Sequence, residues 1–210
     1  MGAETGQAEN LQGVLQRNME LEQQLSDCTQ ALERLTHELQ LAREKLTDLS
    51  LHDSLTGLFN RRHFFVLAMA EVTRALRHGQ PLSLLLVQVD QFRCINDEHG
   101  HAVGDKALKV LAEHLRAVMQ AKGVSARLGS TEFVVLLPQT EQAQAQALAH
   151  ALSQRVAAHG VSGIPMTASV GVAQLWADED CIEAALIRAE GALRQAKALG
   201  PSQVVWAGDR

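Results

Sequence analysis

The side chains in this sequence that are best suited to chemistry gather in three short stretches. Asp90 directly follows an apolar run, Asn96 and Asp105 flank a glycine-containing segment, and Glu132 lies inside the stretch Gly129-Ser-Thr-Glu-Phe133. Carboxylate oxygens are the ligands that hard divalent ions prefer, and an amide beside a carboxylate can hydrogen-bond to the edge of a ligand. Whether these groups act together depends on the elements that position them.

The chain after residue 50 shows alternating helical and strand patterns. Leu82–Val89 is a nearly continuous apolar run, typical of a strand that is buried on both faces, and it places Asp90 at its end. Further strands are predicted at 166–174, at 203–206 and within 125–137, where two strands surround a tight turn at Gly129-Ser130; helices are predicted at 60–77, 104–120, 141–159 and 181–199. This alternation predicts an α/β fold in which helices flank a central sheet.

Residues 11–49 carry a seven-residue repeat of mostly apolar side chains. Its core positions include Asn18, Leu25, Leu32 and Leu39 in one register and Leu21, Cys28 and Leu35 in the other. A repeat of more than five heptads predicts a coiled coil, and the polar Asn18 favours a parallel two-stranded register. The alternative is an amphipathic helix that lies on its own domain, but such a helix would have a wider apolar face. We therefore expect a dimeric coiled coil over residues 1–50 and a globular domain over residues 51–207.

The composition argues against several classes of protein. The net charge is -5 and the 19 Lys and Arg residues are scattered, so a basic surface for nucleic acid is not expected. No apolar run approaches the roughly 20 residues that cross a bilayer, and the N-terminus lacks a secretory pattern, so no direct membrane contact is expected. Cys28, Cys94 and Cys181 are far apart, which argues against a zinc site or a disulfide framework and indicates a reducing cytoplasm.

Short motifs along residues 49–206 resemble those of one protein family. They are Asp53-Ser-Leu-Thr-Gly57-Leu-Phe-Asn60-Arg-Arg62, Val87-Gln-Val-Asp-Gln-Phe92, Asn96–Asp105, Arg127-Leu-Gly-Ser-Thr-Glu-Phe133, Thr167–Ala173 and Ala192–Lys197. In this order and spacing they resemble the GGDEF family, whose intact members are diguanylate cyclases that condense two GTP into cyclic di-GMP with Mg²⁺ or Mn²⁺. The resemblance implies a nucleotidyl-cyclase-like sheet flanked by helices. In the first motif, Gly57 is expected to relieve strain at a turn and Asn60 to cap the following helix.

The chain departs from the family pattern where intact members carry metal-binding carboxylates. The resemblance places those carboxylates at Gln88 and Thr131, whose side chains are an uncharged amide and hydroxyl. Attack of a ribose 3′-hydroxyl on an α-phosphorus builds negative charge that divalent ions must offset, so the loss of two charges disfavours the reaction. Ser130 replaces the second glycine of the signature, and Pro201 replaces a phosphate-facing Arg, whereas the phosphate-facing Lys197 is retained. No catalytic residue, metal or other cofactor is therefore expected.

Two carboxylates remain near the altered positions. Asp90 shares a strand face with Gln88 by the period of two, and Glu132 is one residue past Thr131. One step along a strand turns a side chain to the opposite face, so we expect Glu132 to be a poor substitute for the lost ligand. Asp90 and Glu132 are thus the residual candidates for a metal ion, and Mg²⁺ is expected only if the domain is an enzyme. The product-binding R-x-x-D motif of the family is also missing, because Gln120-Ala-Lys-Gly123 stands in its place.

The part of the sequence that resembles the family's guanine pocket is intact. The resemblance assigns the reading of the guanine edge to Asn96 and Asp105, so GTP or GDP could bind without being turned over. The alternative is structural, with Asn96 capping a turn and Asp105 capping or beginning the helix after Gly104.

Three functions are open at this point. The first is a catalytically degenerate domain that serves, in the cytoplasm, as a dimeric regulatory or interaction module for a signalling protein partner. The second is an active diguanylate cyclase with rearranged metal ligands, and the third is a non-catalytic guanine-nucleotide sensor. The simultaneous changes at Gln88, Thr131 and Pro201 favour the first, because three losses that affect one reaction are hard to offset.

Overall fold

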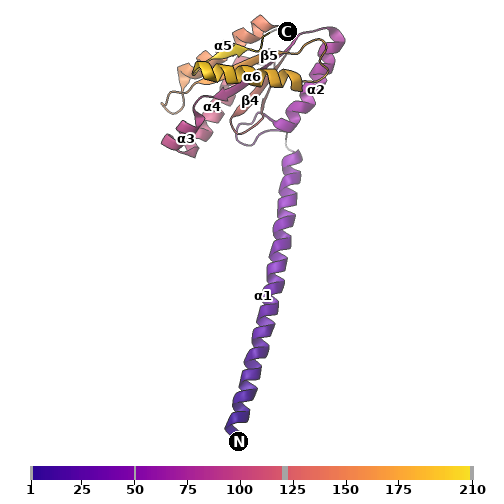
Figure 1. Cartoon of the computed structure of the whole chain (residues 1–210), viewed down its shortest axis with the longest axis vertical. Coiled ribbons are helices and arrows are strands. Elements are labelled where there is room, and N and C mark those ends of the chain that lie inside the picture. Colours follow the sequence, from indigo (N-terminus) through magenta and orange to yellow (C-terminus); the bar gives the residue numbers. More distant parts are fainter. Residues whose placement is uncertain (1, 50, 120–122, 209–210) are drawn as a thin grey trace. The chain divides into compact units, whose positions relative to one another are not determined.

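The computed structural model describes residues 2–49, 51–119 and 123–208 of the chain. The chain divides into two compact units, residues 1–50 and residues 51–210. The first unit contains one uninterrupted helix, α1 (Gly2–Leu49), which spans the predicted heptads (Figure 1). Side chains of α1 are described at residue 17 and at residues 19–41. Positions 120–122, which hold most of the altered product-binding motif, lie outside the described residues.

A six-stranded sheet forms the centre of the second unit. Its strands are β1 (Phe59–Asn60), β2 (Leu82–Val89), β3 (Val124–Arg127), β4 (Glu132–Pro138), β5 (Ala168–Gln174) and β6 (Val204–Trp206), in the spatial order β1-β3-β4-β2-β5-β6. β2 is antiparallel to both of its neighbours, β4 and β5, whereas the outer pairs β1–β3 and β5–β6 are parallel. The predicted strands are confirmed. β1 is too short to show a periodicity in the sequence, so it escapes prediction.

Helices cover both faces of the sheet. They are α2 (Arg61–His78), α3 (Phe92–His99), α4 (His101–Met119), α5 (Gln142–His159) and α6 (Glu183–Leu199). Leu85, Val87 and Val89 of β2 belong to the core on the side of α4 and α5, whereas Leu84 and Leu86 belong to the core on the side of α2 and α6. Figure 1 shows α6 lying across the sheet. This two-sided burial explains the continuous apolar run of β2 and confirms the predicted α/β sandwich.

Local signals in the sequence set the ends of α2. The side chain of Asn60 accepts a hydrogen bond from the backbone N–H of His63 at 2.9 Å, so it caps the N-terminus as predicted. Gly79 ends the helix with φ 60°. Gly57 adopts φ 65° in the preceding turn, a conformation that favours glycine, which confirms its predicted role.

The segment between β2 and β3 differs from the prediction. It contains the additional helix α3, and α4 begins at His101 rather than at Gly104. The interpretation of Asn96 and Asp105 as caps is therefore wrong, because Asn96 lies within α3 and Asp105 lies in the second turn of α4. Gly104 serves close packing instead of a helix start: an ideal Cβ at Gly104 would lie 1.9 Å from Asn96 Oδ1. In the part of the chain that the structure describes, no helix has the length and apolar character to cross a membrane.

Candidate functional site

Gln88 stands at the end of β2, at the level where three strands meet. Its Cα is paired with Glu132 on β4 and with Ser169 on β5. Side chains at paired positions of adjacent strands lie on the same face, and here that face is the one covered by α6. α6 brings Lys197 to the same place, where it lines a hollow together with Gln88 and Glu132.

Gln88 and Thr131, where the resemblance leads us to expect metal-binding carboxylates, are hydrogen-bonded to each other. Gln88 Nε2 donates to Thr131 Oγ1 at 2.6 Å, and Lys197 Nζ donates to Gln88 Oε1. Because an ammonium group only donates, the Gln88 amide turns its oxygen toward Lys197 and its NH₂ group toward Thr131. Burial lowers the pKa of Lys197 below its ordinary value, and the negative charges of Asp90 and Glu132 only partly oppose this. The structure thus brings Gln88, Thr131 and Lys197 together in one network.

Glu132 lies on the same side of the sheet as Gln88, so the expectation that it faces away is wrong. The two residues are Cα partners, and with Lys197 they line one hollow of about 290 Å³. The expectation assumed that Thr131 and Glu132 belong to one regular strand, whereas Thr131 lies in the turn before β4, where strand alternation does not apply. An ideal Cβ at Gly129 would lie 3.3 Å from Glu132 Oε2, so the carboxylate folds back toward the turn.

The carboxylate of Asp90 is engaged by three hydrogen bonds from the protein. Its Oδ1 accepts from Ser169 Oγ at 2.7 Å, and its Oδ2 accepts from Thr167 Oγ1 and from the backbone N–H of Ser202, both at 2.8 Å. Asp90 is only 8% exposed. The contact with Ser202 fixes the loop after α6 that contains Pro201. Asp90 therefore joins the end of β2 to β5 and to this loop.

Arg127 holds the signature turn between β3 and β4. Its Nε donates to the carbonyl of Gly129 at 3.0 Å, and its Nη2 donates to the carbonyl of Ser130 at 2.6 Å. Its Nη1 lies 3.2 Å from Asp53 Oδ1, an atom that also accepts two hydrogen bonds from Thr56. Burial raises the pKa of Asp53, but these hydrogen bonds and the Arg127 charge outweigh burial and leave the pKa below its ordinary value. Arg127 thus holds the turn in place and ties it to Asp53.

The oxygen atoms at this end of the sheet are poor ligands for the divalent ion that the resemblance implies. The Gln88 oxygen accepts from the Lys197 ammonium, the Thr131 hydroxyl accepts from the Gln88 amide, and the Asp90 carboxylate accepts three other hydrogen bonds. Hard ions prefer charged oxygen ligands, and Lys197 already places a positive charge here. Of the residual candidates, Glu132 keeps a carboxylate that could still act as a ligand. Within residues 2–49, 51–119 and 123–208, no three His, Cys, Asp or Glu side chains form a group that could hold a metal ion.

Helices α3 and α4 bring the two residues of the expected guanine pocket to one corner of the fold. Asn96 Oδ1 is buried against Gly104 and finds no hydrogen-bond donor among the described residues. An unpaired buried acceptor costs about 1–3 kcal/mol. Asp105, the neighbour of Gly104 in α4, is exposed. This corner therefore keeps an unused acceptor and an exposed carboxylate, two groups that can receive N–H donors from a base.

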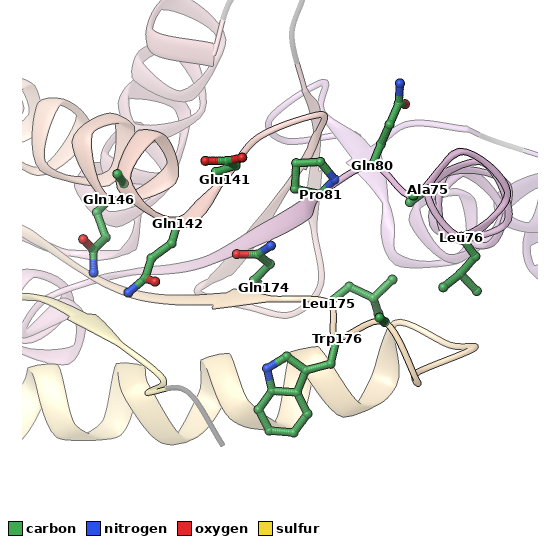
Figure 2. Close-up of a pocket in the computed structure, with 13 residues that line it drawn as sticks. Ala75, Leu76, Gln80, Pro81, Glu141, Gln142, Gln146, Gln174, Leu175 and Trp176 are labelled. Atoms are coloured by element: carbon green, nitrogen blue, oxygen red, sulfur yellow. The ribbon is translucent and has the colours of Figure 1, made fainter.

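The hollows beside Lys197 are small. One of about 240 Å³ is lined by Asp90, Gln91, Lys197, Gly200 and Pro201, and the other is the hollow of about 290 Å³ shared with Gln88. A hollow of about 830 Å³ lies at the opposite end of β2, where β5 ends and α5 begins (Figure 2). Its lining includes four glutamines, Gln80, Gln142, Gln146 and Gln174, and it contains none of the site residues expected from the sequence.

The expected dimerisation seam of α1 is open to solvent in the single chain. Leu21, Leu25, Leu32, Leu35 and Leu39 are 50–70% exposed, and Cys28 is exposed as well. The side chain of Asn18 lies outside the described residues. In a coiled coil, the helix of a second chain would cover this seam. Dimerisation through α1 stays a prediction.

Sequence reasoning missed the residues that secure Asp90. Thr167 and Ser169 alternate along the chain and thus share one face, which is the only sign of their role in the sequence. Their proximity to Asp90 depends on the register of β2 against β5, which places Gln88 opposite Ser169. Ser202 contributes a backbone N–H, so its residue type carries no signal at all.

Comparison with known proteins identifies the family. The family model described as "Diguanylate cyclase, GGDEF domain" matches residues 50–203. The chain is 38% identical over 164 residues to the response regulator PleD of Caulobacter vibrioides, a match that covers 75% of this chain and 36% of PleD. It is 38% identical over 165 residues to the diguanylate cyclase DgcM of Escherichia coli K12, covering 78% of this chain and 40% of DgcM. The chain thus spans less than half the length of these relatives.

Solved structures show the same similarity. The coiled coil and GGDEF domain of DgcB from Caulobacter crescentus, in complex with c-di-GMP, matches with a TM-score of 0.71 and 25% identity, covering 89% of this chain and 98% of that one. The diguanylate cyclase SiaD of Pseudomonas aeruginosa, in complex with its activator SiaC, matches with a TM-score of 0.70 and 29% identity, covering 98% of this chain and 80% of SiaD. The chain therefore belongs to the GGDEF family of diguanylate cyclase domains.

Proposed function

We propose that this chain is a catalytically degenerate GGDEF domain that acts as a dimeric regulatory or interaction module in cyclic di-GMP-type signalling. The hydrogen bond between Gln88 and Thr131 carries this proposal. The two side chains that replace the family's metal ligands satisfy each other at 2.6 Å, and Lys197 donates to the same amide. To bind a divalent ion, Gln88 and Thr131 would have to give up these hydrogen bonds. They would then offer the ion only uncharged oxygen ligands.

The charges near the signature support the same proposal. Attack of a ribose hydroxyl on an α-phosphorus places new negative charge beside Asp90 and Glu132, and divalent ions normally offset it. Here Lys197 is the cation that faces both carboxylates, and burial already disfavours its charged form. A single Lys197 ammonium with two uncharged neighbours, Gln88 and Thr131, supplies less positive charge than divalent ions held by carboxylates would.

A cyclase assay tests this proposal directly. Purified full-length chain is incubated with GTP and either Mg²⁺ or Mn²⁺, and cyclic di-GMP is measured by chromatography. We expect no product above a control without protein. Multiple turnovers that disappear in a Glu132→Ala variant would instead establish the second candidate, an active cyclase that uses Glu132 as a rearranged metal ligand.

The exposed leucine seam of α1 supports the dimeric part of the proposal. A parallel, in-register coil places Cys28 of one chain beside Cys28 of the other, so mild oxidation should form a disulfide between two chains. A Leu25→Glu, Leu32→Glu double variant should lose this cross-link and halve the mass measured by light scattering. An unchanged mass would show that the globular domain dimerises without the coil. Exposed free thiols at Cys28, Cys94 and Cys181 fit our placement of the protein in the cytoplasm.

A guanine-nucleotide sensor is the other non-catalytic candidate, and the unpaired Asn96 Oδ1 favours it. A base that donates N–H groups to Asn96 and Asp105 would relieve the cost of that acceptor once the amide turns outward. Without metal ligands, added phosphates meet Asp90 and Glu132, so GDP or guanosine should bind no worse than GTP. Calorimetric titration with the three compounds tests this, and tight GTP binding that needs Mg²⁺ would contradict it.

A further inference from the structure

Helix α2 presents an apolar stripe to solvent. Its inner face is buried in the core through residues such as Phe64 and Val72. On its outer face Val66 is 61% exposed, Met69 is 73% exposed and Leu76 is 40% exposed. Exposed apolar side chains that lie next to one another on a soluble domain often mark an interaction surface.

The spacing on this outer face matches the surface that one helix offers to another. A shallow hollow of about 660 Å³ lies on α2 and includes Val66, Met69, Ala70 and Thr73, which are spaced i, i+3, i+4 and i+7. Four residues with this spacing form the hole that receives one side chain of a facing helix in knobs-into-holes packing. Ala70 and Thr73 are small, so they leave room at the centre of the hole.

The charges beside the stripe determine what kind of helix would fit. α2 contains four Arg residues and a single acidic residue, Glu71, although the whole chain has a net charge of -5. Arg74 and Arg77 line the hollow. Arg74 is paired with Glu71 at 2.8 Å, whereas Arg77 has no ion-pair partner among the described residues. This helix is thus positively charged although the whole chain is negative, so a partner with carboxylates would complement it.

We propose that this face of α2, from Val66 to Arg77, docks an amphipathic helix of a partner protein that carries carboxylates beside its apolar stripe. The inference rests on the proposed regulatory function, for which it names the docking surface and the chemistry of the partner. A second copy of α2 is a poor occupant, because it would bring two arginine-rich stripes together and leave their charges unpaired.

Two synthetic peptides test the proposal on the full-length chain. Both form amphipathic helices with leucines at the core heptad positions; one carries Glu at the flanking positions and the other carries Lys. Fluorescence anisotropy should show the acidic peptide binding at least about tenfold more tightly than the basic one. Met69→Glu should weaken acidic-peptide binding at least about tenfold, and Arg77→Glu should reverse the preference between the peptides.

Matched controls separate this surface from the rest of the molecule. Ile187→Glu, which changes an apolar side chain that is 68% exposed on α6, should leave peptide binding unchanged. Leu25→Glu should also leave it unchanged, which distinguishes docking on α2 from exchange of the peptide into the coiled coil.

Three outcomes would overturn the proposal: equal binding of both peptides, unchanged binding by the Met69→Glu and Arg77→Glu variants, or self-association of the chain that Met69→Glu abolishes. The last outcome would assign the face to a second copy. Peptide binding and the cyclase assay fail independently, since cyclic di-GMP production would refute the proposed function without affecting the measurement on α2.

Discussion

Two corners of the same domain differ in how their polar groups are paired. At the signature corner, where the family pattern places metal ligands, Gln88 bonds to Thr131 and to Lys197, and the Asp90 carboxylate accepts three hydrogen bonds. At the corner between α3 and α4, where the family pattern places the guanine pocket, Asn96 Oδ1 has no donor among the described residues and Asp105 is exposed. At the first corner the polar side chains are hydrogen-bonded within the protein. At the second corner two acceptors remain that a ligand could use.

Under the proposed function, this difference indicates how a domain of this family can lose catalysis and keep its fold. Gln88 and Thr131 are half-buried, and a polar group without a partner at such a position costs free energy unless it reaches water. The neutral replacements at positions 88 and 131 avoid this cost because an amide and a hydroxyl can bond to each other. At the corner between α3 and α4, Asn96 and Asp105 are the residue types that the resemblance leads us to expect, so the proposal requires no such compensation there.

The largest predicted effect separates the roles of two residues on one strand. Asp90→Ala should lower the free energy of unfolding by about 3–5 kcal/mol, because it leaves donors from Thr167, Ser169 and Ser202 without their charged acceptor. Gln88→Ala should cost less than about 1 kcal/mol, because Thr131 and Lys197 can turn to water. Urea denaturation measures both. Equal losses would show that Gln88 is as structural as Asp90.

The next effect concerns close packing at the corner between α3 and α4. Gly104→Ala should destabilise the domain by about 2–3 kcal/mol, because the new Cβ would lie 1.9 Å from Asn96 Oδ1. Gly191→Ala in α6 is the matched control: its Cβ meets no atom within 4 Å, so helix propensity should make this variant up to about 1 kcal/mol more stable.

A double variant identifies the atom responsible. If Asn96 Oδ1 causes the clash, Gly104→Ala should cost clearly less in an Asn96→Ala background. Additive losses in urea denaturation would place the clash elsewhere, for example at Phe92, whose ring is also close to Gly104.

A comparable effect is expected on ligand specificity. Asp105→Ala should reduce the preference for guanine over adenine nucleotides by about 1.5–3 kcal/mol, because it removes a charged acceptor for the base. Competition calorimetry with GDP and ADP measures this preference. If the wild-type chain binds neither nucleotide, the corner between α3 and α4 is unused and the domain is an interaction module alone.

The smallest effect tests how the signature turn is held. The pKa of Asp53 is lowered in the fold, so this carboxylate stabilises the domain above its unfolded pKa of about 3.9, and the contribution is lost as pH falls through the folded pKa. Asp53→Asn should therefore cost about 1 kcal/mol at neutral pH, a modest value because the group is partly exposed. The difference from wild type should disappear in acid. A difference that does not change with pH would assign the loss to Thr56 contacts alone.

The elements of the fold were more predictable than the contacts between them. The strand over 82–89 and the cap at Asn60 follow from local patterns, and both are confirmed. α3 was missed because its short, mostly polar sequence resembles a loop, and Gly104 suggested a helix start although it serves close packing.

The uncharged residues Gln88 and Thr131 were visible in the sequence, where the resemblance leads us to expect carboxylates, but the contact between them was not. Their mutual hydrogen bond depends on the pairing of β2 with β4 across 43 residues of chain. The position of Glu132 was predicted wrongly for a different reason: the turn before β4 interrupts the strand alternation that the prediction assumed.

Binding of Mn²⁺ at the signature corner tests the central claim most directly. Electron paramagnetic resonance of Mn²⁺ with a non-hydrolysable GTP analogue is recorded for the wild-type chain and for a Gln88→Asp, Thr131→Asp, Ser130→Gly variant. We predict that the wild-type chain leaves the spectrum of the Mn²⁺–nucleotide mixture unchanged, whereas the variant shows saturable binding before it regains full cyclase activity. Saturable Mn²⁺ binding by the wild-type chain that is lost in Glu132→Ala would contradict the account, because it would show that the signature corner still holds a metal.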